Sequence, residues 1–497
     1  MRSSVVRRNV QSADGLFRAL GARAGRISRR RPFYRRLVEL VAQGIGDGRV
    51  VAGAQLPAER DLARALGVSR TTIVSAYREL ESRGLVRGYV GRGTFVCARP
   101  EPGTAPFAWR GKISSAALQS APTTVRDIVQ AASDPRLVNF AAGQPALDQF
   151  PSEDLRRAVD GILMRDPLAA LRFGPTEGQP RLRAAIAKRF GGSPREVLIV
   201  AGAQQGLDLL SRCLIDPGDA VIVDRPGYLG AIDSFRAAGA RLVGWDVLRS
   251  DVDELEEQIL RYKPKFVYLT PTHHNPTGLT MPLRIRREVL ELAARYRLPI
   301  VEDDTYRELS LGNPPPPSLY ALDSDHNIVI HLNSFSKALA PGLRLGWISA
   351  VPAIVEQLTL IKQRADPLTQ NLMQLVVAEL LENGSFDRHL TALRAEHRRR
   401  RDALVAALGP LVAAKQLQFA TPEGGLYLWC RLPPNILAED VLKHAREDGV
   451  VFVPGPPFYV DPGGAHELRL CYTAQPPARA LVAARAIRQG ITVARKP

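Results

Sequence analysis

The sequence predicts an α/β protein in which a small helical domain precedes a larger domain built on a mostly parallel sheet. Residues 32–96 have the spacing of short amphipathic helices followed by a hairpin. From Leu137 onward, apolar strands alternate with helices, which is the pattern of a parallel α/β sheet. With 497 residues, of which 45% are hydrophobic, the chain is long enough for two or three domains and a sizeable core.

The positive charge of the chain is concentrated near its N-terminus. Residues 1–96 contain 19 arginines, no lysine and seven acidic residues, which gives this segment a net charge of +12. The whole chain carries +17, so the remaining residues contribute only +5. This asymmetry indicates a module that binds a polyanion, attached to a nearly neutral body.

Two segments are expected to lack a packed structure. Residues 1–31 hold nine arginines and one acid, Asp14, and predict a mobile basic arm. A solvated tail without function, an arm that touches DNA and an artefact of the start site all remain open for this segment. Residues 99–136 begin with closely spaced prolines and show no long periodic run, so they are expected to form a linker.

Residues 32–98 predict a helix-turn-helix with a β-hairpin wing. Apolar residues repeat at helical spacing along residues 34–45, and a second helix begins within residues 56–63. Gly67 ends that helix, and Ser69 is a suitable N-cap for a third helix over residues 70–83. Residues 85–90 and 94–96 then flank a tip with two glycines, which predicts a hairpin.

These motifs resemble the winged helix-turn-helix domain of GntR-type transcription factors. The matching pieces include Leu56-Pro57-Ala58-Glu59-Arg60-Asp61-Leu62-Ala63, Leu66-Gly67-Val68-Ser69-Arg70-Thr71-Thr72 and Gly91-Arg92-Gly93-Thr94-Phe95-Val96. The resemblance implies that double-stranded operator DNA is a partner. Guanidinium groups can read guanine, and hydroxyl groups at a helix N-terminus can hold phosphates. The residues expected to face DNA are Arg60, Ser69, Arg70, Thr71, Thr72 and, at the wing tip, Arg92.

Beyond Leu137, five predicted strands end in loops that carry polar groups. In open α/β sheets, ligands bind outside the carboxyl ends of the strands, so these five loops can line one pocket. The predicted strands are residues 197–200, 221–223, 266–270, 300–302 and 328–330.

One of these loops, residues 334–347, places a lysine between two serines and ahead of an arginine. An amine that can form a Schiff base beside phosphate-binding groups suits a phosphorylated aldehyde, pyridoxal 5'-phosphate (PLP). Lys337 is the expected Schiff-base residue, and a solvated surface lysine is the alternative for this stretch alone. The groups expected to hold the phosphate are Gly202, Ala203, Gln204, Ser334, Ser336 and Arg344.

The other loops supply partners for the pyridine ring of the same cofactor. Tyr228 can stack on the ring, and Asp303 can pair with a protonated ring nitrogen, which keeps the ring an electron sink. Asn275 and Tyr306 can hydrogen-bond the phenolic oxygen of the ring.

Residues 137–490 resemble the fold-type I PLP-dependent aminotransferases of class I/II. The resemblance lies in Asn275-Pro276-Thr277-Gly278, Glu302-Asp303-Asp304-Thr305-Tyr306, Ser334-Phe335-Ser336-Lys337 with residues 341–346, and Leu468-Arg469-Leu470. It implies a mostly parallel sheet with flanking helices and a small C-terminal α+β domain. It also implies that Lys337 is the catalytic lysine and that Arg469 grips the carboxylate of a substrate or effector. Gly143, in a loop near the start of the domain, is assigned to the same ligand.

Together the two parts resemble MocR-type regulators, a GntR subfamily in which an aminotransferase-like domain senses an effector. The resemblance implies a head-to-tail homodimer. The leading hypothesis is a PLP-dependent transcriptional regulator that senses an amino-group-containing or B6-related effector by aldimine exchange at Lys337. An active aminotransferase of aminoadipate-like or broad specificity is the main alternative, and a DNA-binding protein with an inactive, cofactor-free body is the third.

Cysteine spacing, apolar runs and two short motifs give expectations for cellular location, metal binding and surface charge. Four widely spaced cysteines and no apolar run of membrane length predict a cytoplasmic protein that does not enter a membrane. His273-His274 raises a metal site as a possibility, but no ligand pattern accompanies the pair and loop packing is favoured. The arginines at 398–401 are interpreted as a solvated or interface helix rather than a nucleic-acid patch.

Overall fold

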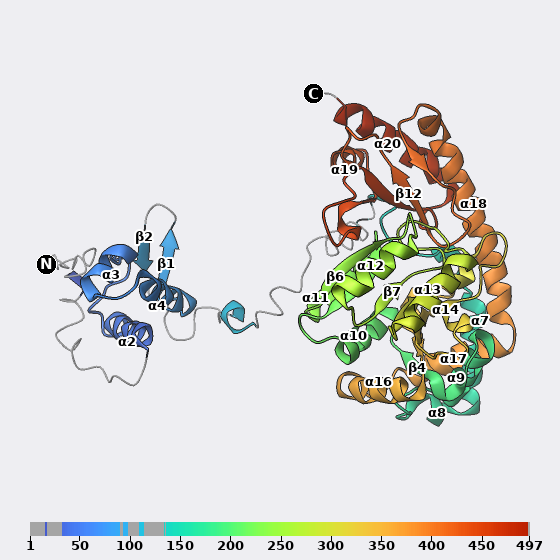
Figure 1. Ribbon diagram of the computed structural model, residues 1–497, viewed down its shortest axis with the longest axis horizontal. Helices are drawn as coiled ribbons and strands as arrows, with labels where there is room; N and C mark the ends of the chain where they lie inside the picture. Colours follow the sequence, from blue (N-terminus) through green and yellow to red (C-terminus); the bar gives the residue numbers. More distant parts are fainter. Residues whose placement is uncertain are drawn as a thin grey trace. The chain divides into compact units, whose positions relative to one another are not determined.

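The computed structural model describes residues 15–16, 32–89, 93–97, 109–113, 134 and 136–495. The chain divides into two compact units, residues 1–118 and residues 119–497 (Figure 1). Among the described residues, none of the helices is both long and apolar enough to cross a bilayer.

The small unit is a three-helix domain with a hairpin. Helices α2 and α3 both pack against α4 around a core that includes Leu37, Leu62 and Ile73. Gly67 ends α3 in the left-handed conformation, with φ of 63°, and the Ser69 hydroxyl accepts the Thr72 backbone N–H, which caps α4. The elements are α2 (Phe33–Gly46), α3 (Glu59–Leu66), α4 (Arg70–Ser82), β1 (Val86–Tyr89) and β2 (Gly93–Val96).

The predicted helix-turn-helix and wing are confirmed in the described residues. Strands β1 and β2 pair antiparallel, with Val86 opposite Val96 and Tyr89 opposite Gly93. The predicted wing-tip residue Arg92 lies outside the described residues. The basic arm at 1–31 also lies outside them, except for Gly15 and Leu16; Leu16 is fully buried in the core of the small unit. In the predicted linker, a short 3-10 helix, η2 (Trp109–Lys112), is described.

A seven-stranded sheet forms the centre of the large unit. Its strand order is β4-β10-β9-β8-β7-β5-β6, and all pairings are parallel except those of β10, which runs antiparallel to β4 and β9. The confirmed fold class is therefore α/β with a mostly parallel sheet. The strands are β4 (Val197–Val200), β5 (Ala220–Arg225), β6 (Arg241–Asp246), β7 (Val267–Leu269), β8 (Ile300–Asp303), β9 (Val329–Ser334) and β10 (Gly346–Ser349).

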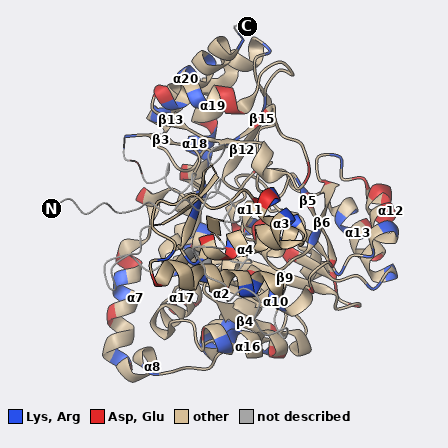
Figure 2. Cartoon of the chain, turned by 90° about the vertical axis from the view of Figure 1, so that its left-hand side faces the viewer, with Lys and Arg blue, Asp and Glu red and all other residues tan. Residues whose placement is uncertain are grey.

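Helices cover both faces of this sheet because successive strand residues point to opposite sides. Val221 and Val223 of β5 pack with α10 (Ala203–Leu214), α11 (Leu229–Ala237) and α16 (Pro352–Ala365), whereas Ile222 packs with α12 (Val252–Tyr262) and α13 (Leu283–Arg295). The other described α-helices of this unit before α18 are α7 (Ser152–Arg165), α8 (Pro167–Leu171), α9 (Pro180–Phe190), α14 (Leu319–Leu322), α15 (Phe335–Ala338) and α17 (Asn371–Glu382). On the surface, α7 carries basic and acidic residues side by side (Figure 2).

The C-terminal part of the large unit is a smaller α+β layer joined to the sheet by the long helix α18 (Ser385–Ala413). Its four-stranded antiparallel sheet has the order β11-β12-β15-β14 and packs with α19 and α20 (Figure 1). A parallel pair between β3 and β13 ties the start of the unit to this layer. The elements are β3 (Val138–Asn139), β11 (Gln418–Phe419), β12 (Tyr427–Arg431), α19 (Ala438–Glu447), β13 (Val450–Val451), β14 (Val453–Pro454), β15 (Glu467–Cys471) and α20 (Ala480–Ala494).

Candidate functional site

The five predicted loops meet at one cavity of about 130 Å3, which we call the Lys337 cavity. Larger cavities exist in the same unit, but this is the one that contains the lysine predicted from the sequence. Ten predicted side chains line it: Ala203, Gln204, Tyr228, Asn275, Asp303, Tyr306, Ser334, Ser336, Lys337 and Arg344. Thr270, Thr305 and Pro341 line it as well.

Lys337 stands on α15, the short helix that follows β9. The Ser334 hydroxyl caps α15 by accepting the Ser336 backbone N–H at 3.1 Å. The Lys337 Nζ donates to the Gly143 carbonyl oxygen at 2.5 Å, which brings together two residues predicted to bind a ligand. Burial, aided by the positive charges of Arg469 and Arg344, lowers the pKa of Lys337 to about 8.

An anion cup lies beside the lysine. Gly202 precedes α10 with φ of 87°, and a Cβ at this position would lie 2.8 Å from the Arg344 Nη2. Glycine suits this positive φ and leaves room for the guanidinium of Arg344 at the start of α10, where it donates to the Ala201 carbonyl at 2.8 Å. The first backbone N–H groups of a helix have no helical acceptor, so they and the hydroxyls of Ser334 and Ser336 can hold a phosphate.

Asp303 provides a buried carboxylate at the end of β8. Its Oδ2 accepts the Tyr268 hydroxyl at 2.8 Å, and its Oδ1 accepts the Thr305 hydroxyl at 2.6 Å. Burial raises the pKa of Asp303, and within the described residues it forms no ion pair. A protonated ring nitrogen in the Lys337 cavity would supply the missing positive charge, so this carboxylate fits a pyridine cofactor.

A chain of hydrogen-bonded polar side chains runs from Tyr427 to Arg469, and its two middle members, Tyr306 and Asn275, line the cavity. The Tyr306 and Tyr427 hydroxyls lie 3.2 Å apart, and the Asn275 Nδ2 donates to the Tyr306 hydroxyl at 3.2 Å. Arg469 donates to the Asn275 Oδ1 at 2.9 Å and to the Ala141 carbonyl at 2.7 Å, while its guanidinium carbon lies 4.3 Å from the Tyr427 ring centroid. The Nε of Arg469 is buried without a hydrogen-bond partner, so this guanidinium can still take an anionic oxygen.

Tyr228 reaches the cavity from the start of α11. Its hydroxyl donates to the Gln204 Oε1 at 3.4 Å, and the Gln204 Nε2 donates to the Ser234 hydroxyl at 2.8 Å. These contacts with Ser234 and Tyr228 occupy the side chain of Gln204. Gln204 can therefore offer its backbone N–H, and not its side chain, to an anion.

Sequence reasoning missed Tyr268, Thr270, Thr305 and Tyr427. Tyr268 and Thr270 lie on and just after β7, and the alternation along this predicted strand was the signal that could have placed both on the same side as the cavity. Tyr427 comes from β12 of the C-terminal layer, and a Cβ on Gly143 would lie 2.2 Å from its hydroxyl oxygen. No sequence signal near the other motifs pointed to it.

The histidine pair of the Asn275 loop is held by neighbouring hydroxyls and a carboxylate. His273 contacts the Ser310 hydroxyl at 2.8 Å, and burial lowers the pKa of His273 to about 4. His274 contacts the Thr277 hydroxyl at 2.8 Å and the Asp224 carboxylate at 3.2 Å. These contacts order the loop that presents Asn275.

In the small unit, four of the predicted DNA-facing residues, Ser69, Arg70, Thr71 and Thr72, lie at the start of α4, and Arg60 lies in the first turn of α3. Arg60, Arg70 and Thr71 are exposed. Arg70 pairs with Glu59 at 3.1 Å while its side chain stays 65% exposed, so the guanidinium can still exchange this partner for DNA. Ser69 is bound to Thr72 as a helix cap, which makes its first role structural.

Two protein families match the two units. Residues 33–96 match the gntR family of bacterial regulatory proteins, and residues 135–487 match the aminotransferase class I and II family.

Individual relatives divide between enzymes and regulators. The chain is 38% identical over 371 residues to a 2-aminoadipate transaminase of Thermus thermophilus, covering 74% of this chain and 93% of the relative. It is 30% identical over 429 residues to a Rhizobium meliloti protein named as probable rhizopine catabolism regulatory protein MocR, covering 85% of this chain and 86% of that one. A solved structure of the α-aminoadipate aminotransferase LysN from Thermus thermophilus, complexed with N-(5'-phosphopyridoxyl)-L-leucine, is similar with a TM-score of 0.73 and 36% identity, covering 78% of this chain and all of that one.

Proposed function

The chain belongs to the aminotransferase class I and II family and joins to it a gntR-type domain in the MocR-type arrangement, and from this premise we propose that it is a PLP-dependent transcriptional regulator. The observation that carries the proposal is the pairing of an exposed helix-turn-helix face at Arg70 and Thr71 with a lysine cavity in the same chain.

PLP supplies an aldehyde that condenses with amines and a ring that withdraws electrons. In this chain Lys337 is the amine that would hold it, and Asp303 is the carboxylate that would keep the ring nitrogen protonated. The anion cup of Gly202, Ser334, Ser336 and Arg344 would hold the phosphate.

An amino-group-containing or B6-related effector is the expected signal. An amino acid brings an amine that can replace that of Lys337 and a carboxylate that suits Arg469, whose Nε has no partner. Binding of such a ligand would draw on the Arg469–Asn275–Tyr306 chain, which joins the C-terminal layer to the main sheet. A change in the packing of these two layers is the means by which the effector would alter DNA binding.

A head-to-tail homodimer is part of the proposal. Four exposed apolar side chains on and after α7 and α8 support a dimer, since monomeric proteins rarely expose a large apolar patch. These side chains are Met164, Leu168, Leu171 and Phe173, which are 85%, 67%, 73% and 86% exposed.

The proposal is tested with the full chain and DNA fragments selected from a random library. With PLP bound, the chain is expected to retard a subset of fragments, and an amino acid effector is expected to change the affinity or the spacing of half-sites. Retardation that does not respond to any amino acid or B6 compound would remove the sensing part of the proposal. If no DNA fragments are selected, the proposal that the chain is a transcriptional regulator is wrong.

An aminotransferase of aminoadipate-like or broad specificity is the second candidate. It is favoured by the intact lysine, acid and arginine set and by the identity to the 2-aminoadipate transaminase. Steady turnover of 2-aminoadipate with 2-oxoglutarate, without any selected DNA, would reverse the order of the two proposals.

A further inference from the structure

A second cavity of about 730 Å3 lies in the large unit and shares no lining residue with the Lys337 cavity. We call it the His331 cavity. It lies between the end of α9, the segment after β8, the loop at 312–318 and α18, and its wall includes Asp304, Arg307 and His331. Strands β8 and β9 separate the two cavities, because Asp303 lines one and Asp304 lines the other.

The lining of the His331 cavity carries an excess of positive charge. Arg189, Arg307, Arg394 and Arg398 line it, against the carboxylates of Asp304 and Glu308, and Asp387 outside the lining pairs with Arg189 at 2.8 Å. Glu308 is shared by Arg189 at 2.9 Å and Arg394 at 3.1 Å. Arg398 donates to the Leu311 carbonyl, and within the described residues it forms no ion pair. A small anion would balance this charge.

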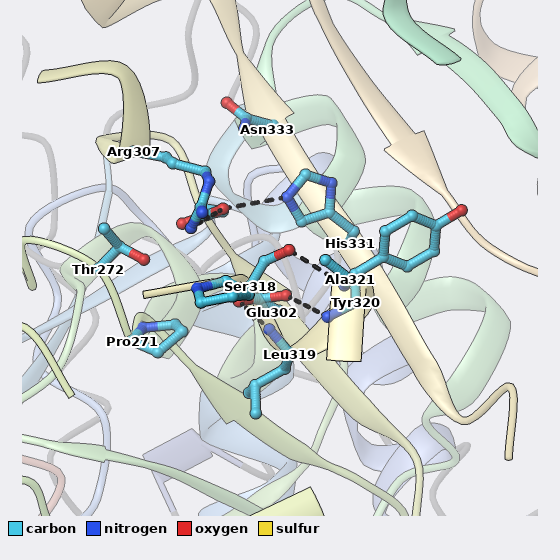
Figure 3. A network of polar contacts seen from close by, with 12 residues as sticks. Pro271, Thr272, Glu302, Arg307, Ser318, Leu319, Tyr320, Ala321, His331 and Asn333 are labelled. Atoms are coloured by element: carbon cyan, nitrogen blue, oxygen red, sulfur yellow. Dashed lines mark hydrogen bonds and ion pairs between the residues drawn. The ribbon is translucent and has the colours of Figure 1, made fainter. Parts of the chain in front are cut away.

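The Asp304, His331 and Arg307 side chains at the cavity wall contact one another, but each has one buried polar atom without a hydrogen bond. Asp304 is 0% exposed and His331 is 2% exposed; the Asp304 Oδ2 lies 3.4 Å from the His331 Nε2 and 3.6 Å from the Arg307 Nη1 (Figure 3). The atoms left without a hydrogen bond are the Asp304 Oδ1, the His331 Nδ1 and the Arg307 Nη1. The Arg307 Nη1 still has its ion pair with Asp304, whereas no polar contact from the described residues reaches the His331 Nδ1. Buried polar atoms are nearly always hydrogen-bonded, so this imidazole nitrogen points to a polar ligand.

Contacts outside the cavity fix the residues that form its walls. Glu302 accepts the backbone N–H groups of Leu319 and Tyr320, both at 2.9 Å, and the ring of Tyr320 stacks on His331 with centroids 5.4 Å apart (Figure 3). The loop between Gly312 and Ser318 contains four prolines, which restrict its backbone. A preformed wall of this kind loses little entropy when it binds a ligand.

We propose that the His331 cavity is a second ligand site, distinct from the cofactor site, for a small anionic molecule that carries a carboxylate or phosphate group. Its volume lies within the range of small-molecule pockets, roughly 300–1,000 Å3, so it can take a molecule of metabolite size. Arg398 supplies the charge without an acidic partner in the described part of the chain, and the Asp304–His331–Arg307 cluster supplies polar groups for the rest of the molecule. This site goes beyond the proposed regulator function, which does not require it.

The experiment compares two neighbouring arginines on one helix. Arg398→Gln removes a charge from the cavity, whereas Arg399→Gln removes the same charge from a side chain that is 64% exposed, pairs with Glu396 and does not line the cavity. Ala395→Trp adds bulk at an exposed lining position of α18 without removing any hydrogen bond of the side chain.

Binding of succinate and of inorganic phosphate is measured by titration calorimetry on the PLP-loaded full chain. We expect a saturable component for at least one probe, weakened at least about tenfold by Arg398→Gln, abolished by Ala395→Trp and unchanged within about twofold by Arg399→Gln. Succinate alone would identify a carboxylate site and phosphate alone a phosphate site. The proposal is overturned if neither probe binds, if Ala395→Trp removes no component, or if the two arginine variants weaken binding equally. Circular dichroism checks folding, and Ala395→Trp decides the matter if Arg398→Gln fails to fold.

Discussion

Asp303 and Asp304 follow one another in the chain, yet their carboxylates belong to separate networks. Asp303 accepts hydroxyl groups from Tyr268 and Thr305 in the Lys337 cavity, whereas Asp304 faces His331 and Arg307 in the neighbouring cavity. The two carboxylates at the end of β8 therefore line two cavities, because consecutive side chains of an extended chain point to opposite sides. Of these two carboxylates, that of Asp303 lines the Lys337 cavity, where we propose that the cofactor binds.

Replacing each aspartate by asparagine should separate these roles. We expect Asp303→Asn to weaken PLP retention about 10- to 100-fold, the worth of a charge-assisted hydrogen bond, without destabilising the cofactor-free protein. Asp304→Asn should lower the free energy of unfolding by about 3 kcal/mol, because it leaves the mostly buried Arg307 without its charge partner. Equilibrium dialysis measures PLP retention, and denaturant unfolding measures the free energy of unfolding. Equal losses of PLP in both variants would show that the two aspartates do not have separate roles.

The sequence was sufficient to place the strands, the loops and most of the Lys337 cavity, because the carboxyl ends of parallel strands meet at one edge. It was less informative where contacts depend on tertiary packing. Strand β9 runs to Ser334, four residues beyond the predicted end at Ile330, since its polar residues His331 and Asn333 are buried by elements distant in the chain. Tyr427 was missed for the same reason.

The run of arginines at 398–401 shows the limit of composition as a guide. A helix directs four consecutive side chains to different sides, and here they lie in different environments. Arg400 is buried against Asp148 and Glu396, Arg399 pairs with Glu396 from an exposed position, and Arg401, 15% exposed, pairs with the exposed Asp402. The local charge alone could not show that Arg398 would lie beside a cavity and donate to a backbone carbonyl instead of a carboxylate.

The pKa of Lys337 can be tested without the cofactor. Burial disfavours the charged amine, so the neutral form should predominate above pH 8 and decline below it, whereas an ordinary lysine has a pKa of about 10.4. We expect acetylation of Lys337 by acetic anhydride, followed by mass spectrometry of the cofactor-free protein, to reach half its maximal rate near pH 8. The exposed lysines of the same chain are the internal reference, and a Lys337 profile that coincides with theirs would contradict the prediction.

Arg469 should distinguish amino acids from simple amines. We expect Arg469→Gln to weaken the binding of an amino acid to the PLP-loaded protein about 10- to 100-fold, since a charge-assisted contact to the carboxylate is lost. The amine formed by removing that carboxylate should bind both forms alike. Titrations followed by the visible absorbance of the cofactor measure both ligands. If the amine loses as much affinity as the amino acid, Arg469 acts by shaping the cavity and not as a carboxylate clamp.

Arg70 and Arg83 form a matched pair for testing the DNA-binding face. Arg70 opens α4 and pairs with Glu59 at 3.1 Å, and Arg83 follows its last turn and pairs with Glu79 at 2.9 Å. Because recognition groups lie at the N-terminal end of the second helix of a helix-turn-helix, Arg70→Ala should cost about 1–3 kcal/mol of specific DNA binding. Arg83→Ala removes an equal charge at the far end and should change the affinity less than about threefold. Gel-shift titrations at one fixed salt concentration compare them, and similar losses in both variants would reduce the role of Arg70 to general electrostatic attraction.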